Sequence, residues 1–130
     1  MNRDEMDRAL KARFVPALRQ LGFKGPLPHF RRLRDDRVDL LTAQFDRHGG
    51  GLVVELSQCG AEGITTHWGK FIAASIVTAH DLHPSQRHRL GSPGPNIDHW
   101  FRFDDGTQPM AVADLLCAHI DEAERWWASR

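Results

Sequence analysis

The sequence has little cysteine, no net charge and no long apolar run, and each absence narrows the class of protein. Its two cysteines, Cys59 and Cys117, lie in neither a CxxC pair nor a zinc-ligand spacing. Residues 71–79, the longest uncharged stretch in the middle of the chain, are far short of the about 20 needed to span a bilayer. The amino terminus is charged and lacks the apolar core of a secretory signal. We therefore expect a cytoplasmic protein with reduced thiols and no membrane partner.

The formal charge of zero is unevenly distributed along the chain. Residues 1–37 carry ten Lys or Arg against five Asp or Glu, whereas residues 104–130 carry two against six. This complementarity predicts either that the two ends lie close together or that a basic face binds an acidic partner. Although residues 30–34 combine a phenylalanine with three arginines, the neutral domain lacks the basic character of nucleic-acid binders. We therefore expect no nucleic-acid partner.

Apolar spacing predicts a helix at each end of the chain. Residues 3–21 carry an apolar side chain every three to four positions and end at Gly22, which favours a left-handed cap. Pro16 lies inside this pattern and predicts a kink rather than two helices. The second helix is predicted to begin near Thr107, with Pro109 in its first turn.

Between the helices the patterns are extended. Strands are predicted at residues 30–34, 38–46, 52–59, 86–90 and 97–103. Glycines and a proline interrupt residues 60–85, where only the pairs 71–72 and 76–77 suggest short strands. The chain is thus predicted to be a single α+β domain, residues 1–130, with an antiparallel sheet of about five strands. The N-terminal and C-terminal helices are expected to pack on one face of that sheet.

Strand alternation places a mixed set of polar and aromatic side chains on the other face. These residues are Gln44, Glu55, Ser57, Arg89, Trp100 and Arg102. Trp and Arg are enriched at binding hot spots, which indicates a protein interface or a self-associating surface. Two other interpretations stay open: a solvated face with Glu55–Arg cross-strand pairs, and a small-ligand pocket.

No assembled catalytic motif is present. Residues 49–51 are glycines without a P-loop or dinucleotide-binding context, so a hairpin turn is predicted there. Ser57 lacks a GxSxG elbow, and Cys59 is predicted to be a buried structural thiol. We assign no catalytic residue and no cofactor.

Eight histidines are many for this length, and four of them cluster in the second half of the chain. These are His80, His83, His88 and His99. Three imidazoles are a suitable ligand set for zinc or iron, but HExxH is absent and Pro84 prevents a helix from presenting His80 and His83 on one side. The default expectation is solvated loop histidines without a bound metal.

Several short motifs in order carry a family resemblance. They are Leu21-Gly22-Phe23, Phe30-x-Arg32, Leu41-x-x-Gln44, Arg89-Leu90-Gly91 and Asp98-x-Trp100-Phe101. Together they resemble a bacterial family catalogued as domain of unknown function 4304, over roughly residues 8–104. The resemblance implies a small α+β domain without an established activity. It also puts Arg32, Gln44, Arg89 and Trp100 on motif positions.

These observations lead to two functional hypotheses. The first is a non-catalytic module that binds a protein partner or a second copy of itself through the open sheet face. Its expected binding residues are Arg32, Gln44, Glu55, Arg89, Trp100 and Arg102. The alternative is a small enzyme, with or without the assistance of a metal, that uses the histidines between His67 and His99. Whether the chain is an enzyme is left open by the sequence.

Overall fold

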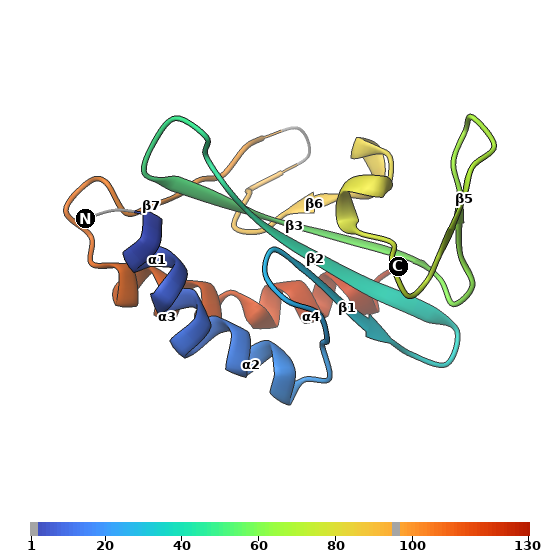
Figure 1. Cartoon of the computed structure of the whole chain (residues 1–130), viewed down its shortest axis with the longest axis horizontal. Helices are drawn as coiled ribbons and strands as arrows, with labels where there is room; N and C mark the ends of the chain where they lie inside the picture. Colours follow the sequence, from blue (N-terminus) through green and yellow to red (C-terminus); the bar gives the residue numbers. More distant parts are fainter. Residues whose placement is uncertain (1–2, 95–96) are drawn as a thin grey trace.

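The structure is a computed structural model that describes residues 3–94 and 97–130, and a curved antiparallel sheet runs through it (Figure 1). The central strands β1 (His29–Leu33), β2 (Arg37–Phe45) and β3 (Gly51–Gly60) form a meander, each antiparallel to the next. The turns between them contain Asp35-Asp36 and the glycines Gly49 and Gly50, as predicted, while Gly51 is the first residue of β3. The sequence therefore located the centre of the sheet correctly, and the α+β class is confirmed.

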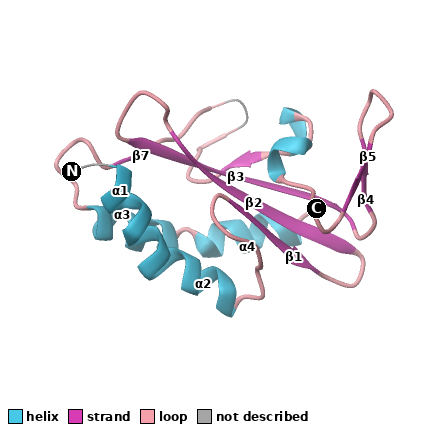
Figure 2. Ribbon diagram, in the orientation of Figure 1, coloured by secondary structure: helices cyan, strands magenta, loops and turns pink. Residues whose placement is uncertain are grey.

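Four short strands extend this meander. The free edge of β3 pairs with β6 (His88–Arg89) and β7 (Phe101–Arg102), over two residue pairs each. At its far end β3 leads into a hairpin of β4 (Gly63–Thr65) and β5 (Phe71–Ala73). Figure 2 shows this hairpin standing at one end of the molecule, away from α1, α2 and α3. It accounts for the strands beyond the five predicted, because it lies within the unassigned residues 60–85.

The N-terminal helix is one helical run with an irregular middle. It consists of α1 (Arg3–Ala9), a π-helical turn at Leu10–Phe14, and α2 (Val15–Gln20). The N–H of Val15 donates to the carbonyl of Leu10, five residues earlier. Pro16 has no N–H to donate to the preceding turn, and its ring crowds the carbonyl four residues earlier. The irregular turn therefore lies directly before Pro16. The predicted single interrupted helix is confirmed, and Gly22 follows it with a φ of 96°.

The C-terminal helix differs from its prediction because it is broken into two. Helix α3 (Pro109–Ala118) begins two residues after the predicted start, and α4 (Ile120–Ala128) follows after His119. The N–H of His119 is shared between the carbonyls of Leu115 and Leu116, which tightens the chain at that point. The break turns the axis, so that α3 packs on the N-terminal helix and α4 packs on β3.

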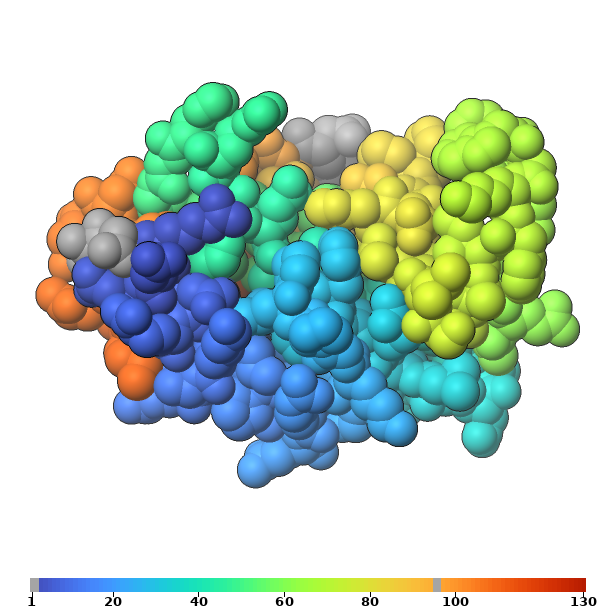
Figure 3. All heavy atoms as spheres, viewed as in Figure 1, coloured from blue at the N-terminus to red at the C-terminus, as the bar shows by residue number. Residues whose placement is uncertain are grey.

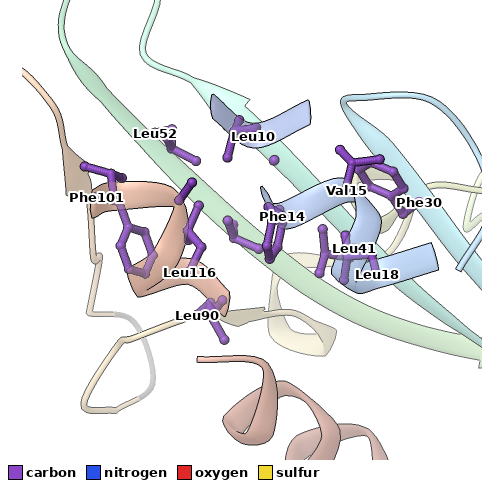
Figure 4. Close-up of a cluster of buried hydrophobic side chains, with 14 of the residues drawn as sticks. Leu10, Phe14, Val15, Leu18, Phe30, Leu41, Leu52, Leu90, Phe101 and Leu116 are labelled. Atoms are coloured by element: carbon purple, nitrogen blue, oxygen red, sulfur yellow. The ribbon is translucent and has the colours of Figure 1, made fainter. Parts of the chain in front are cut away.

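Both helical segments cover the same face of the sheet, as predicted. Leu10 and Phe14 from the N-terminal helix meet Leu41 and Leu52 from the sheet and Leu116 from α3 (Figure 4). At the rim of this core, the Arg13 guanidinium lies 3.2 Å from the Asp114 carboxylate. The basic and acidic ends of the chain are therefore in contact.

The opposite face is open only in part, which corrects the sequence-based expectation. The irregular segment 74–87 folds across it and includes two 3₁₀ turns, η2 (Ala79–Asp81) and η3 (Pro84–Gln86). Val77, Ala79 and Leu82 bury Val38 and Leu40 of β2 in a second, smaller apolar cluster. Residues 76–77 do not form the predicted strand, because Val77 fills this cluster while Ile76 remains exposed. In the space-filling view the segment, drawn in yellow, lies beside the yellow-green hairpin (Figure 3).

None of the helices within residues 3–94 and 97–130 is long and apolar enough to cross a membrane.

Candidate binding site on the sheet face

Four side chains from four adjacent strands form a row on the face away from the helices. His29 of β1 is paired with Thr42 of β2, Thr42 with Glu55 of β3, and Glu55 with Arg89 of β6. Directly paired residues of an antiparallel sheet point to the same side, so these side chains are neighbours. The predicted grouping of Glu55 with Arg89 is thus present.

Glu55 is the centre of a cluster of positive and titratable groups, which we call the Glu55 cluster: Glu55, His80, Arg87 and Arg89. Its Oε1 lies 3.2 Å from His80 Nε2 and 3.5 Å from Arg87, and its Oε2 lies 3.9 Å from Arg89. The hydrogen bond from His80 lowers the pKa of Glu55, and the two arginines lower it further against the opposing effect of burial. Glu55 is therefore a buried, ionised carboxylate at neutral pH.

His29 lies next to this cluster in the row. Its Nδ1 is 2.8 Å from the Thr42 hydroxyl, and its ring centroid is 6.0 Å from that of His80. Burial lowers the pKa of His29, and the neighbouring His80 lowers it further. The imidazole of His29 is therefore neutral at pH 7.

Ser57 is not exposed on the open face, in contrast to the sequence-based expectation. Its side chain has no exposed surface, and its hydroxyl donates to the carbonyl of Gln86 at 2.9 Å. Segment 74–87 covers it together with most of the Glu55 side chain, which is 12% exposed. The strand alternation placed Ser57 and Glu55 on the correct face. Segment 74–87, which covers them, has no periodic sequence pattern, so its position could not be predicted.

The uncovered part of the face carries the remaining predicted residues. We call it the sheet-face patch, and it consists of Gln44, Arg89, Trp100 and Arg102. Trp100 is 36% exposed, and it lies with Arg102 against the backbone of Gly51, where a methyl group would be 3.2 Å from the indole. Arg89 is opposite Glu55, four residues along β3 from Gly51. Two arginines therefore flank Trp100 along one edge of the sheet.

The arginines of the patch are only partly satisfied by the chain itself. Arg89 lies 3.4 Å from the exposed carboxylate of Asp98, and Arg102 lies 3.5 Å from that of Asp104. The Nε of Arg89 is buried and has no hydrogen-bond partner among the described residues. Arg102 thus holds a long, exposed ion pair that a better-placed carboxylate can replace. Arg89 is mostly buried and is shared between Glu55 and the exposed Asp98, so a partner carboxylate can reach it only from the Asp98 side.

Arg32, the remaining predicted binding residue, lies on the opposite face beneath the helices. Its side chain is 7% exposed and donates twice to Asp39 and twice to Glu124 of α4. Phe23 and Trp127 cover its guanidinium plane. Burial would lower the pKa of Arg32, but the hydrogen bonds with Glu124 and Asp39 outweigh this and raise it. These contacts tie α4 to β1 and β2.

The histidines grouped by sequence are divided between the two faces. His80 contacts Glu55, whereas His88 lies 2.8 Å from Glu122 of α4 on the helix-covered side. His83 bonds the neighbouring Ser85, and His99 stacks edge-on against Phe101. Neighbouring strand residues point to opposite faces, which separates His88 from the side that carries Arg89 and His80. Within residues 3–94 and 97–130, no three His, Cys, Asp or Glu side chains are placed to hold a metal ion together.

A cavity of about 870 Å³ lies between the β4–β5 hairpin and segment 79–87. Cys59 and His80 both line it. Burial raises the pKa of the Cys59 thiol to about 11, and no imidazole opposes this effect. The thiol is therefore protonated at neutral pH and unsuited to nucleophilic attack. Cys59 is half-buried at the cavity wall rather than fully buried as predicted.

Comparison with known proteins places this fold in a family. A family model described as Domain of unknown function (DUF4304) matches residues 14–130. The chain belongs to this family. The DUF4304 match confirms the resemblance seen in the short motifs and extends it through α4. No curated protein and no solved structure matches the chain. The DUF4304 description names no activity, so function has to be argued from the site.

Sequence reasoning missed two features that shape this site. Asp39 shares a face with Leu41 and Ala43, and a carboxylate at such a core-facing position signals a buried ion pair. That signal was available in the strand pattern. His29 and His80 meet near Glu55 only through long-range packing, and nothing in their sequence spacing indicates it.

Proposed function

We propose that this DUF4304 chain is a non-catalytic module that binds an acidic segment of a partner protein through the sheet-face patch. The observation that carries the proposal is the pair of under-satisfied arginines, Arg89 and Arg102, on either side of the exposed Trp100. An indole supplies a rigid apolar contact, and the guanidinium groups supply donors that fit carboxylates. The exposed Asp98 and Asp104 show the geometry in which a carboxylate meets each arginine.

An acidic occupant would take the places of Asp98 and Asp104, the exposed carboxylates that now meet the two arginines. The only carboxylate that faces Arg89 from within the covered sheet is Glu55, among the described residues, and it is shared with His80 and Arg87. A second copy of this chain is the other candidate occupant, because its residues 104–130 are acidic.

The chemistry of the buried nucleophile candidates supports binding rather than covalent catalysis. The Cys59 thiol stays protonated at neutral pH, and the Ser57 hydroxyl is committed to a backbone carbonyl. A small enzyme remains the second hypothesis because of one contact, the Glu55–His80 pair, in which a carboxylate orients an imidazole beside a cavity. The enzyme hypothesis would be stronger if a second histidine from residues 67–99 lay beside Glu55. Among the described residues, the second histidine in this region is His29 of β1, whose ring centroid lies 6.0 Å from that of His80.

The test starts with native mass spectrometry of untagged protein isolated gently from its own host. Any co-purifying protein is then titrated against purified wild-type chain and variants. We expect Trp100→Ala and Arg89→Gln each to raise the Kd by about tenfold or more. Trp68→Ala and Arg125→Gln, at exposed positions away from the patch, serve as matched controls and should leave the Kd unchanged.

The salt dependence of binding and the nature of the bound species distinguish an acidic partner segment from a second copy of this chain and from an enzyme. Binding to an acidic segment should weaken steeply with ionic strength, and less steeply in Arg89→Gln. Unchanged affinity in both patch variants overturns the proposal. A homodimer that dissociates in Trp100→Ala would replace the foreign partner by a second copy. A stoichiometric metal in place of protein would favour the enzyme.

A further inference from the structure

The cavity beside the hairpin is separate from the sheet-face patch. Its walls come from the end of β3, from β4 and the turn after it, and from the segment that contains η2 and η3. None of Gln44, Arg89, Trp100 or Arg102 lines it. Its volume of about 870 Å³ falls in the range of small-molecule sites.

One wall of the cavity presents a flat aromatic surface. Trp68 in the β4–β5 turn is 67% exposed, and His67 stands perpendicular to it with ring centroids 4.7 Å apart. Such edge-on packing fixes the indole from one side and leaves a face for another ring. Ile64 and Leu82 contribute further apolar surface. The wall therefore suits a planar apolar body.

Arg87 is the one arginine or lysine among the described lining residues of the cavity. Arg87 lines it, directing Nε to the carbonyl of Leu82 and one terminal nitrogen to that of His80, with a third contact to Glu55 at 3.5 Å. A guanidinium has five N–H groups, so donors remain after these contacts. His67, His80 and His83 add imidazole rings.

The acidic side chain of the lining is partly committed. Asp81 Oδ2 accepts from the N–H of Thr78 at 2.8 Å and lies 3.3 Å from the Thr78 hydroxyl, which closes the turn η2. The turn therefore uses one of the two oxygens of Asp81. A ligand anion would find the remaining N–H groups of Arg87 and the imidazoles of His67 and His83, because His80 Nε2 is directed to Glu55. The charge pattern thus selects a single negative group.

We infer that this cavity binds a small planar molecule with one carboxylate, the ring against Trp68 and the carboxylate towards Arg87 and the histidines. The site is a second one, independent of the proposed protein-binding patch. A single guanidinium with imidazoles matches a monoanion, and the indole discriminates flat from saturated rings.

The probe for this site is 2-naphthoate, compared with its neutral amide, 2-naphthamide, and with cyclohexanecarboxylate. Binding is measured by NMR titration, following the imidazole C–H resonances and the Trp68 indole N–H. We expect saturable 2-naphthoate binding, with 2-naphthamide and cyclohexanecarboxylate each weaker by about tenfold. Resonances of His67, His80 and His83 should shift, while that of His48 in the β2–β3 turn should not.

Variants at exposed positions keep the fold intact while they test the wall. Trp68→Ala should weaken 2-naphthoate binding at least about tenfold. The matched control is Phe71→Ala, because Phe71 is 59% exposed on the same hairpin and does not line the cavity. Trp100→Ala should also leave this binding unchanged, which makes failure here distinguishable from failure of the protein-binding proposal.

Three outcomes overturn the inference. They are the absence of saturable binding, equal affinity for the acid and its amide, and full affinity in Trp68→Ala. Circular dichroism and the Tm of each variant confirm that the comparison is made on folded protein.

Discussion

Asp39 is a buried carboxylate with several charged and polar partners in the helix-covered layer. Its carboxylate has no exposed surface and meets Arg32, Arg34 and Arg37, and Gln58 donates to it at 2.9 Å. The Arg32 guanidinium links it to Glu124 of α4. A buried charge with several partners is tolerated only while the partners remain, so the network specifies how α4 docks rather than adding large net stability.

The residue-scale prediction concerns Asp39→Ala. Removing this carboxylate leaves Arg32 buried with one partner fewer, so we expect the free energy of unfolding to fall by about 3–5 kcal/mol. Urea denaturation followed by circular dichroism measures it. Asp7→Ala, which breaks the exposed Asp7–Lys11 pair, is the control and should change stability by less than about 0.5 kcal/mol. If Asp39→Ala lowers the free energy of unfolding by less than about 1 kcal/mol, the ion pairs of Asp39 are not needed to hold Arg32 in its buried position.

Strand β6 is the element that joins the two faces. It has two residues, His88 and Arg89, which point to opposite sides of the sheet. His88 reaches Glu122 of α4, and Arg89 reaches Glu55. Glu122 also accepts from His119 at 3.0 Å and from the N–H of Gly91 at 3.0 Å. One carboxylate on α4 therefore holds β6 and the chain beyond it against the helix layer.

The element-scale prediction follows from the protonation of Glu122. Burial alone would raise its pKa, but the hydrogen bonds from His88, Gly91 and His119 outweigh this, and the pKa lies below the ordinary 4.5. A carboxyl with a lowered folded pKa stabilises the fold above its unfolded pKa, and this stabilisation disappears as the pH falls through the folded value. We expect Glu122→Gln to lose about 1 kcal/mol at pH 7.

The pH dependence distinguishes this effect from simple loss of packing. Between about pH 5 and pH 3, the variant should lose less stability than the wild type, because one linked group is absent. Urea unfolding at a series of pH values measures the difference. Asp121→Asn, an exposed neighbour on α4, should follow the wild-type curve. Parallel curves for Glu122→Gln and wild type would contradict the assignment.

At the scale of the whole molecule, the two faces of the sheet are covered very unequally. Among the described residues, the cluster on the helix-covered face has twenty-one buried apolar residues, whereas the second cluster has five. The opening free energy of a region depends on the apolar surface that it buries, so segment 74–87 should open before the rest. The proposed ligand cavity lies against this less stable layer.

Native-state hydrogen exchange tests this hierarchy. Amides of residues 76–87 should exchange through openings of lower free energy than those of β2 and β3. Val77→Ala should lower the opening free energy of the segment by about 1–2 kcal/mol while leaving β2 and β3 protection nearly unchanged. Ile76→Ala, at the exposed neighbouring position, is the control. Equal loss of protection across the sheet would show that both layers unfold as one unit.

The sequence by itself determined the α+β class, the central meander and the assignment of side chains to faces. These follow from periods of 2 and 3.6, which are local properties of the chain. Thus Glu55 and Arg89 were predicted to share a face, and they do. The tertiary structure alone decided how segment 74–87 covers Ser57, how His80 reaches Glu55, and that Arg32 lies beneath α4. These depend on contacts between residues far apart in the chain, whose geometry no local period records.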